Sequence, residues 1–129
     1  MPDERKVVHI PAKPAKYIPY TEYMELLYKI PTDKITRRID IATYLKEKYN
    51  AERIEFSGSI TDYPNWLYVP FWKEVSERGF LQESSVCSRD RQEIKLKEEG
   101  FHIVPCGAKG QSLKVESYKD HLFNFYTLR

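Results

Sequence analysis

The chain has 129 residues and a mass of 15.4 kDa, enough to bury a single core and too few for two domains. A hydrophobic content of 41% with 31% charged residues excludes a disordered or collagen-like chain, while a net charge of +2 is too small to identify a partner. No apolar run approaches the roughly 20 residues of a membrane span, and the charged start at residues 1–6 is unlike a secretory signal, so we expect a cytoplasmic protein with no membrane partner.

Four of the eight prolines fall in residues 1–19. We therefore expect residues 1–19 to form a proline-rich, extended N-terminal arm, followed by a domain over residues 20–129. The first predicted helix begins near Thr21, which is a suitable N-cap. Aromatic and aliphatic side chains then recur at helical spacing as far as Tyr28, and Pro31 ends the helix.

A second helix is predicted after Thr36, which is a suitable N-cap, with Ile41 and Leu45 on its apolar face. The segment 50–70 is ambiguous. Arg53 to Phe56 fits either a short strand or a poor helix, and a short helix is a further interpretation of Ser57 to Tyr63.

The clearest helix is predicted from Asp90 to Glu99. Asp90 and Glu93 resemble a capping box at its start, and Gly100 stands at the left-handed position that follows many helices. Residues 101–105 and 113–118 are typical of a hairpin, and the apolar tail after residue 119 is expected to dock on the domain. The predicted fold class is therefore α/β and mainly helical, a winged helix-turn-helix-like domain with a small hairpin.

The most informative motif is the segment 30–42, Ile-Pro-Thr-Asp-Lys-Ile-Thr-Arg-Arg-Ile-Asp-Ile-Ala. A helix start with free backbone N–H groups and two guanidinium groups, those of Arg37 and Arg38, is suited to bind a phosphate. The alternative interpretation places both arginines on a solvated helix face.

This segment resembles the Ile-Pro-x-Gly-Lys-Val-Thr-Thr-Tyr-Gly-x-Ile-Ala motif of the DNA-binding domain of alkylguanine-DNA alkyltransferases and of the non-enzymatic alkyltransferase-like proteins. Residues 91–101 resemble the helix of that family that ends in a Glu-Gly step. Between them, residues 69–75 (Val-Pro-Phe-Trp-Lys-Glu-Val) occupy the place of the family's Pro-Cys-His-Arg-Val. The resemblance covers residues 20–105, in the same order along the chain.

The departures from the family motif bear on activity. With Pro70 aligned to the motif's proline, Phe71 stands at the alkyl-accepting cysteine, Trp72 at the histidine and Lys73 at the arginine. A phenyl ring cannot act as a nucleophile, so the resemblance implies a protein that is not an enzyme. A shift by one residue would instead place Trp72 at the cysteine and Val75 at the motif's valine.

The resemblance implies that the protein binds duplex DNA and recognises alkylated guanine. Arg38 stands where the family has a tyrosine that presses on the phosphate beside a flipped nucleotide, and the family's intercalating arginine has no counterpart here. Tyr63 is a candidate wedge in its place. The predicted DNA-binding residues are Thr36, Arg37, Arg38, Ser57, Ser59, Thr61 and Tyr63. The predicted lesion pocket comprises Pro70, Phe71 and Trp72.

Two other function classes stay open. One is a protein-interaction module on the same scaffold that has lost DNA binding, which the small net charge, Asp62 and the missing arginine favour. The other is a cysteine-dependent alkyl-transfer enzyme that uses Cys87 or Cys106, although Cys106 lies after the Glu-Gly step and fits an ordinary turn thiol. No cofactor and no zinc site are expected, because no Cys-x-x-Cys or His-x-x-x-His spacing connects Cys87, His102, Cys106 and His121.

Overall fold

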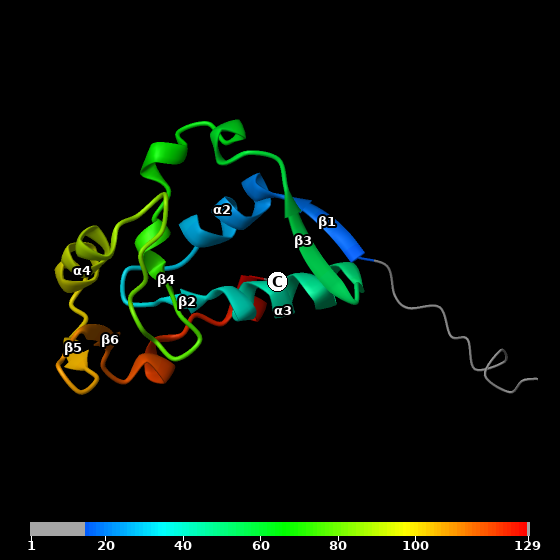
Figure 1. Ribbon diagram of the computed structural model, residues 1–129. Coiled ribbons are helices and arrows are strands. Elements are labelled where there is room, and N and C mark those ends of the chain that lie inside the picture. Colours follow the sequence, from blue (N-terminus) through cyan, green and yellow to red (C-terminus); the bar gives the residue numbers. More distant parts are fainter. Residues whose placement is uncertain (1–14, 129) are drawn as a thin grey trace, which may run out of the picture.

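Two groups of short elements, each around its own apolar cluster, make up the structure (Figure 1). The computed structural model describes residues 15–128. The helices are α2 (Tyr20–Tyr28), α3 (Arg38–Tyr49) and α4 (Arg89–Glu98). The strands are β1 (Ala15–Pro19), β2 (Thr36–Arg37), β3 (Arg53–Ser57), β4 (Glu74–Val75), β5 (Ile103–Cys106) and β6 (Ser112–Val115). Turns of 3-10 helix are η1 (Ile60–Asp62), η2 (Trp66–Tyr68), η3 (Phe71–Lys73), η4 (Tyr118–His121) and η5 (Phe125–Leu128).

The first group packs α2 and α3 against the parallel strands β1 and β3. Met24 and Leu27 of α2 are fully buried, and they share an apolar cluster with Ile41 and Leu45 of α3 and with Ile18 of β1. Each such side chain contributes about 1.5–3 kcal/mol when it is removed from water. Because isolated helices of this length are unstable in water, this cluster rather than helix propensity holds α2 and α3 in place.

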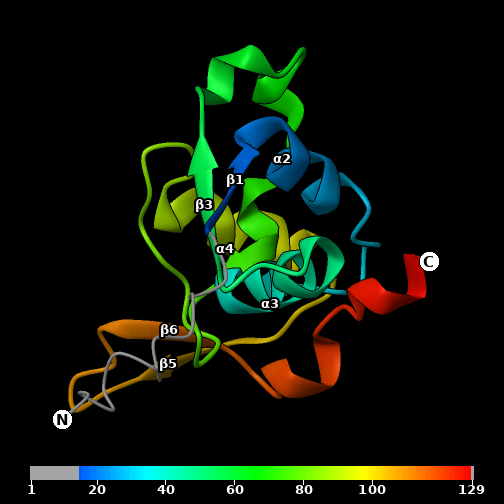
Figure 2. The same cartoon turned by 90° about the vertical axis from the view of Figure 1, so that its right-hand side faces the viewer.

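The second group surrounds a smaller cluster that joins β2 and β4 to α4 and the β5–β6 hairpin. Val75, Leu96 and Val115 are fully buried there. Figure 2 shows the hairpin at one end of the molecule and the segment 58–68 at the other. The helices, and the loops that connect the two groups, therefore lie between these two ends.

Lys73, at the end of η3, links the two groups. Its side chain is only 3% exposed, and its ammonium group forms an ion pair with Glu99 at the end of α4. The same Nζ donates to backbone carbonyl oxygens of the turn after α2, at 2.8, 3.1 and 3.0 Å for Pro31, Thr32 and Lys34. Burial lowers the pKa of the Lys73 ammonium, and Glu99 opposes that shift.

The three predicted helices are confirmed, but their predicted caps are wrong. The N-cap positions are Pro19, Arg37 and Ser88 instead of Thr21, Thr36 and Asp90. Thr36 belongs to β2 and is fully buried, where its hydroxyl packs inside the fold instead of capping α3. Gly100 has the predicted left-handed conformation, with φ of 97°.

The ambiguous segment 50–70 is resolved as a strand followed by turns. Residues 53–57 form β3, and the short helix considered for Ser57 to Tyr63 is a single 3-10 turn, η1. Residues 15–19 of the expected arm form β1, which pairs with β3 from Ala15↔Arg53 to Pro19↔Ser57. The remainder of the expected arm, residues 1–14, lies outside the described residues.

The hairpin and the docked tail are confirmed. β5 and β6 pair antiparallel from Ile103↔Val115 to Cys106↔Ser112, and Phe125 is buried against Tyr44, with ring centroids 5.7 Å apart. The α/β, mainly helical architecture with a small hairpin is thus as predicted. Over residues 15–128, every helix is too short or too polar to span a lipid bilayer.

Candidate functional site

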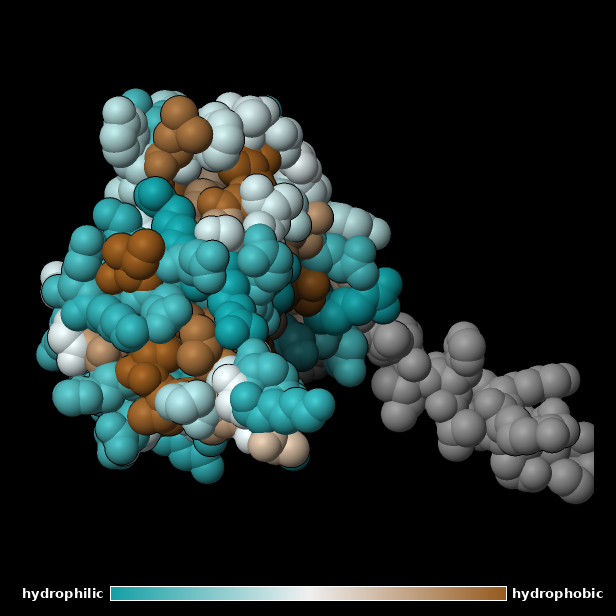
Figure 3. All heavy atoms as spheres, turned by 60° about the vertical axis from the view of Figure 1, so that its left-hand side comes forward, coloured by the Kyte–Doolittle hydropathy of each residue, from teal (hydrophilic) through white to brown (hydrophobic). Residues whose placement is uncertain are grey.

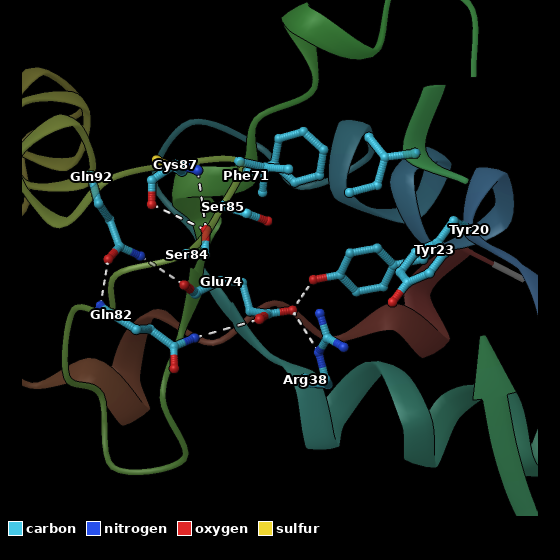
Figure 4. Close-up of a pocket in the computed structure, with 12 residues that line it drawn as sticks. Tyr20, Tyr23, Arg38, Phe71, Glu74, Gln82, Ser84, Ser85, Cys87 and Gln92 are labelled. Carbon is cyan, nitrogen blue, oxygen red and sulfur yellow. Dashed lines mark hydrogen bonds and ion pairs between the residues drawn. The ribbon is translucent and has the colours of Figure 1, made fainter. Parts of the chain in front are cut away.

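A cavity of about 170 Å³ lies between the two groups of elements (Figure 4). One side is the aromatic wall, which we define as Tyr20, Tyr23 and Phe71. The opposite side is formed by the segment 82–87 and by Gln92 of α4. The cavity is smaller than the roughly 300–1,000 Å³ of pockets that enclose drug-sized ligands, so it is suited to a single ring system.

The aromatic wall is held rigidly by the first apolar cluster. Tyr23 is buried, and Tyr20 and Phe71 pack on the cluster from the cavity side. Phe56 of β3 supports the tyrosines, stacking on Tyr20 with ring centroids 5.5 Å apart and meeting Tyr23 edge-on at 5.2 Å. A flat apolar group that enters the cavity would therefore meet ring surfaces that are already ordered.

Glu74 forms the polar end of the cavity. Its carboxyl group accepts a hydrogen bond from the Tyr23 hydroxyl, and it lies 3.4 Å from both Arg38 Nε and Gln82 Nε2 (Figure 4). The Glu74 side chain is 14% exposed. Burial raises the pKa of Glu74 to about 7, because removal from water penalises the charged carboxylate more than the neutral acid.

Arg38 stands at the mouth of the cavity, and its neighbour Arg37 does not. The Arg38 side chain is 54% exposed, with its guanidinium 5.1 Å from the centre of the Tyr23 ring. Arg37 instead makes a bidentate pair with Asp40, at 2.8 Å for each bond, and donates to the Glu77 carbonyl at 3.1 Å. Asp40 raises the pKa of Arg37 further. Arg38 is therefore the arginine of this pair that retains free donors for an anion.

The segment 57–63 borders the same cavity through Ile60. Ser59 and Thr61 are exposed and lie close together, with their hydroxyl oxygens 2.8 Å apart. Asp62 accepts a hydrogen bond from the Ser59 backbone at 2.9 Å, which fixes the turn. The half-buried Tyr63 ring stacks on Tyr28 with centroids 6.0 Å apart.

The predicted pocket residues separate in the structure. Phe71 lines the cavity, Pro70 is buried, and Trp72 turns towards α4, where its Nε1 donates to Glu99 at 2.6 Å. The three stretches that resemble the family motif meet in the structure around Lys73 and Glu99. They contribute residues 30–34, residues 71–73 and Glu99.

The two thiols differ in their surroundings. Cys87 is buried and lines the cavity, where burial raises the pKa of its thiol. Cys106 is half-buried on the β5–β6 hairpin, in the second group of elements. A raised pKa disfavours the thiolate that alkyl transfer requires. Within residues 15–128, His, Cys, Asp and Glu side chains form no group of three that could hold a metal ion.

No protein-family model matches the sequence, and no curated protein matches it. Among solved structures, the chain is similar to the crystal structure of S. pombe Atl1 in complex with damaged DNA containing O6-carboxymethylguanine. The sequences are 19% identical, the match covers 81% of this chain and 94% of that chain, and the TM-score is 0.58. The fold is alkyltransferase-like.

The alkyltransferase-like fold accounts for the order of the matched segments, but the sequence did not reveal the polar side of the cavity. Glu74, Gln82 and Gln92 were not predicted as site residues. Glu74 stands among charged and aromatic residues and resembles a surface charge. Gln82 belongs to no motif, and Gln92 lies in the stretch 91–101 without a feature that marks it as a site residue. Gln92 is nevertheless buried and bonds to the backbone oxygens of Trp72 and Glu74 at 3.1 and 2.7 Å.

Proposed function

We propose that the protein binds duplex DNA and recognises alkylated guanine without transferring the alkyl group. The observation that carries this proposal is the cavity beside Phe71, with an exposed arginine at its mouth, in an alkyltransferase-like fold. Enzymes and sensors that act on a base hold it extruded from the duplex between aromatic side chains. The aromatic wall supplies such surfaces, and Arg38 is placed to bind a backbone phosphate.

The absence of alkyl transfer follows from placing Phe71 at the position of the family's cysteine. The positions of the two candidate side chains support this alignment. Phe71 lines the cavity, whereas Trp72 turns away from it and donates to Glu99 of the Glu-Gly step. Burial raises the pKa of the Cys87 thiol, which lines the cavity, and so disfavours its thiolate. The protein would therefore hold a lesion for other proteins to process.

Substitution of Arg38 by Ala is expected to weaken binding to a duplex with one O6-alkylguanine by about tenfold at low salt. The slope of log K against log salt should decrease by about 0.9, the value for one lost phosphate contact. Fluorescence anisotropy at several salt concentrations measures both quantities. Arg53→Ala is the matched control, since that side chain is 65% exposed on β3 and pairs with Glu55. Equal affinity and slope for the two variants would overturn the role of Arg38.

Incubation with an O6-alkylguanine oligonucleotide is expected to leave the intact mass of the protein unchanged. Neither a phenyl ring at position 71 nor a protonated Cys87 accepts the alkyl group. Intact-protein mass spectrometry measures this directly, with Cys87→Ser as the variant that identifies the acceptor. A mass increase equal to the alkyl group would contradict the proposal and establish an enzyme, and its loss in Cys87→Ser would locate the acceptor.

One observation favours the protein-interaction module as a second candidate. After α3 the chain forms the strand β3 and not a second helix that could enter a DNA groove. The segment that follows exposes Leu67 and Tyr68, at 67% and 73%. Figure 3 shows hydrophobic atoms among paler ones at this end of the molecule. Binding to neither plain nor alkylated duplex would favour this candidate over the DNA binder.

A further inference from the structure

The carboxyl group of Glu74 has unused hydrogen-bonding capacity. It faces the space between the aromatic wall and the segment 82–87 (Figure 4). A carboxylate offers about four lone-pair sites, and the Tyr23 hydroxyl occupies one of them. Arg38 and Gln82 approach the carboxyl group only at 3.4 Å, beyond the usual range of such bonds. A ring held against the aromatic wall would therefore present its edge to a carboxyl group that can still bind it.

The edge of guanine changes its donor pattern when O6 is alkylated. Guanine presents two neighbouring donors, the N1–H and the N2 amino group. Alkylation of O6 removes the hydrogen from N1, which becomes an acceptor beside the N2 donor. An ionised carboxylate only accepts hydrogen bonds and so matches guanine, whereas a neutral carboxylic acid has one donor and one acceptor and so matches the alkylated base.

We propose that Glu74 recognises the edge of a flipped guanine in this cavity, and that its neutral carboxylic acid selects the O6-alkylated base over guanine. This inference rests on the function proposed above and names the residue that would set its specificity. The neutral acid donates its O–H to N1 and accepts from the N2 amino group. The ionised carboxylate would instead face the N1 lone pair, which disfavours the lesion.

Both states of Glu74 are populated near neutral pH, since burial raises its pKa to about 7. The groups that face it come from every neighbouring element: Tyr20 and Tyr23 from α2, Arg38 from α3, Gln82 and Cys87 from the segment 82–87, and Gln92 from α4. Glu74 therefore changes charge between pH 6 and 8.

Arg38 connects the protonation state of Glu74 to DNA binding. Its Nε lies 3.4 Å from the Glu74 carboxyl group, and a cation close to a carboxyl group generally favours the ionised form. A backbone phosphate that binds the exposed guanidinium competes for the same positive charge. Engagement of the DNA backbone would therefore shift Glu74 towards the neutral acid that fits the lesion.

The test measures affinity for two duplexes, one plain and one with a single O6-methylguanine, by fluorescence anisotropy from pH 6 to 8. For the wild-type protein, the preference for the lesion should fall about tenfold across this range, following the protonated fraction of one group with a pKa near 7. In Glu74→Gln the amide always offers one donor and one acceptor. Its preference should stay constant, at the value that the wild type reaches at pH 6.

The outcomes separate this inference from the function on which it rests. A lesion preference that does not change with pH in the wild type, or that changes equally in Glu74→Gln, overturns the role of Glu74 and leaves the proposed function standing. Equal binding to both duplexes at every pH overturns the proposed lesion recognition, and the role of Glu74 with it. Thermal denaturation of Glu74→Gln at pH 6 establishes that the variant is folded.

Discussion

Replacement of Lys73 by Met is expected to lower the free energy of unfolding by about 3–5 kcal/mol, the cost of leaving one member of a buried ion pair without its partner. Met fills nearly the same space as the lysine stem but provides no donor. Glu99, whose side chain is 13% exposed, then loses its cation, and three carbonyl oxygens of the turn after α2 lose their shared donor. Urea denaturation followed by circular dichroism measures the change.

Two further variants make the Lys73 prediction specific. Lys97→Met alters an exposed ion pair with Glu93 on α4, at 2.7 Å, and should change stability by no more than about 0.5 kcal/mol. Glu99→Gln combined with Lys73→Met should recover part of the loss, because the unpaired charge is then absent. A loss below about 1 kcal/mol for Lys73→Met would contradict the assignment of Lys73 as the link between the two groups of elements.

Glu74 is expected to make the stability of the protein fall by about 2 kcal/mol between pH 5.5 and 8. Its pKa is about 7 in the folded state and about 4.3 in an unfolded chain. Between these values the folded protein binds the proton more tightly than the unfolded chain does. Stability is therefore full below the unfolded pKa and is lost as pH rises through the folded pKa.

The measurement is the difference in unfolding free energy between the wild type and Glu74→Gln across this pH range. Contributions from groups common to both proteins cancel in that difference. Glu55→Gln is the control, because the Glu55 side chain is 47% exposed and pairs with Arg53 on the surface. A difference that stays constant from pH 5.5 to 8 would show that Glu74 is ionised throughout, against the expectation.

Sequence patterns predicted the elements that depend on local chemistry. The helical spacing from Tyr20 to Tyr28, the turn at Pro31 and the left-handed Gly100 are each determined by neighbouring residues, and each is found in the structure. Residue preference alone predicts the caps, and the structure overrides that preference. Thr36 has a residue type that favours the N-cap, but it pairs with Glu74 and so belongs to β2.

The features that depend on distant residues were not predictable in the same way. The parallel pairing of β1 with β3 joins residues 38 positions apart, as in Ala15 and Arg53, and no local pattern identifies such a partner. The cavity likewise depends on contacts between residues that are far apart in the sequence. Its polar end acquires its chemistry from burial between segments, so Glu74 could not be distinguished from a surface charge until the fold placed it beside Arg38 and Tyr23.

The β1–β3 pairing also constrains the order in which the chain folds. Parallel neighbours cannot be joined by a tight turn, so the chain between β1 and β3, which carries α2 and α3, must be compacted before this ladder can close. Such non-local contacts form late and slow the folding of small domains. We therefore expect the helices around Met24 and Leu45 to form first, and the first strand of the described chain to be among the last elements added.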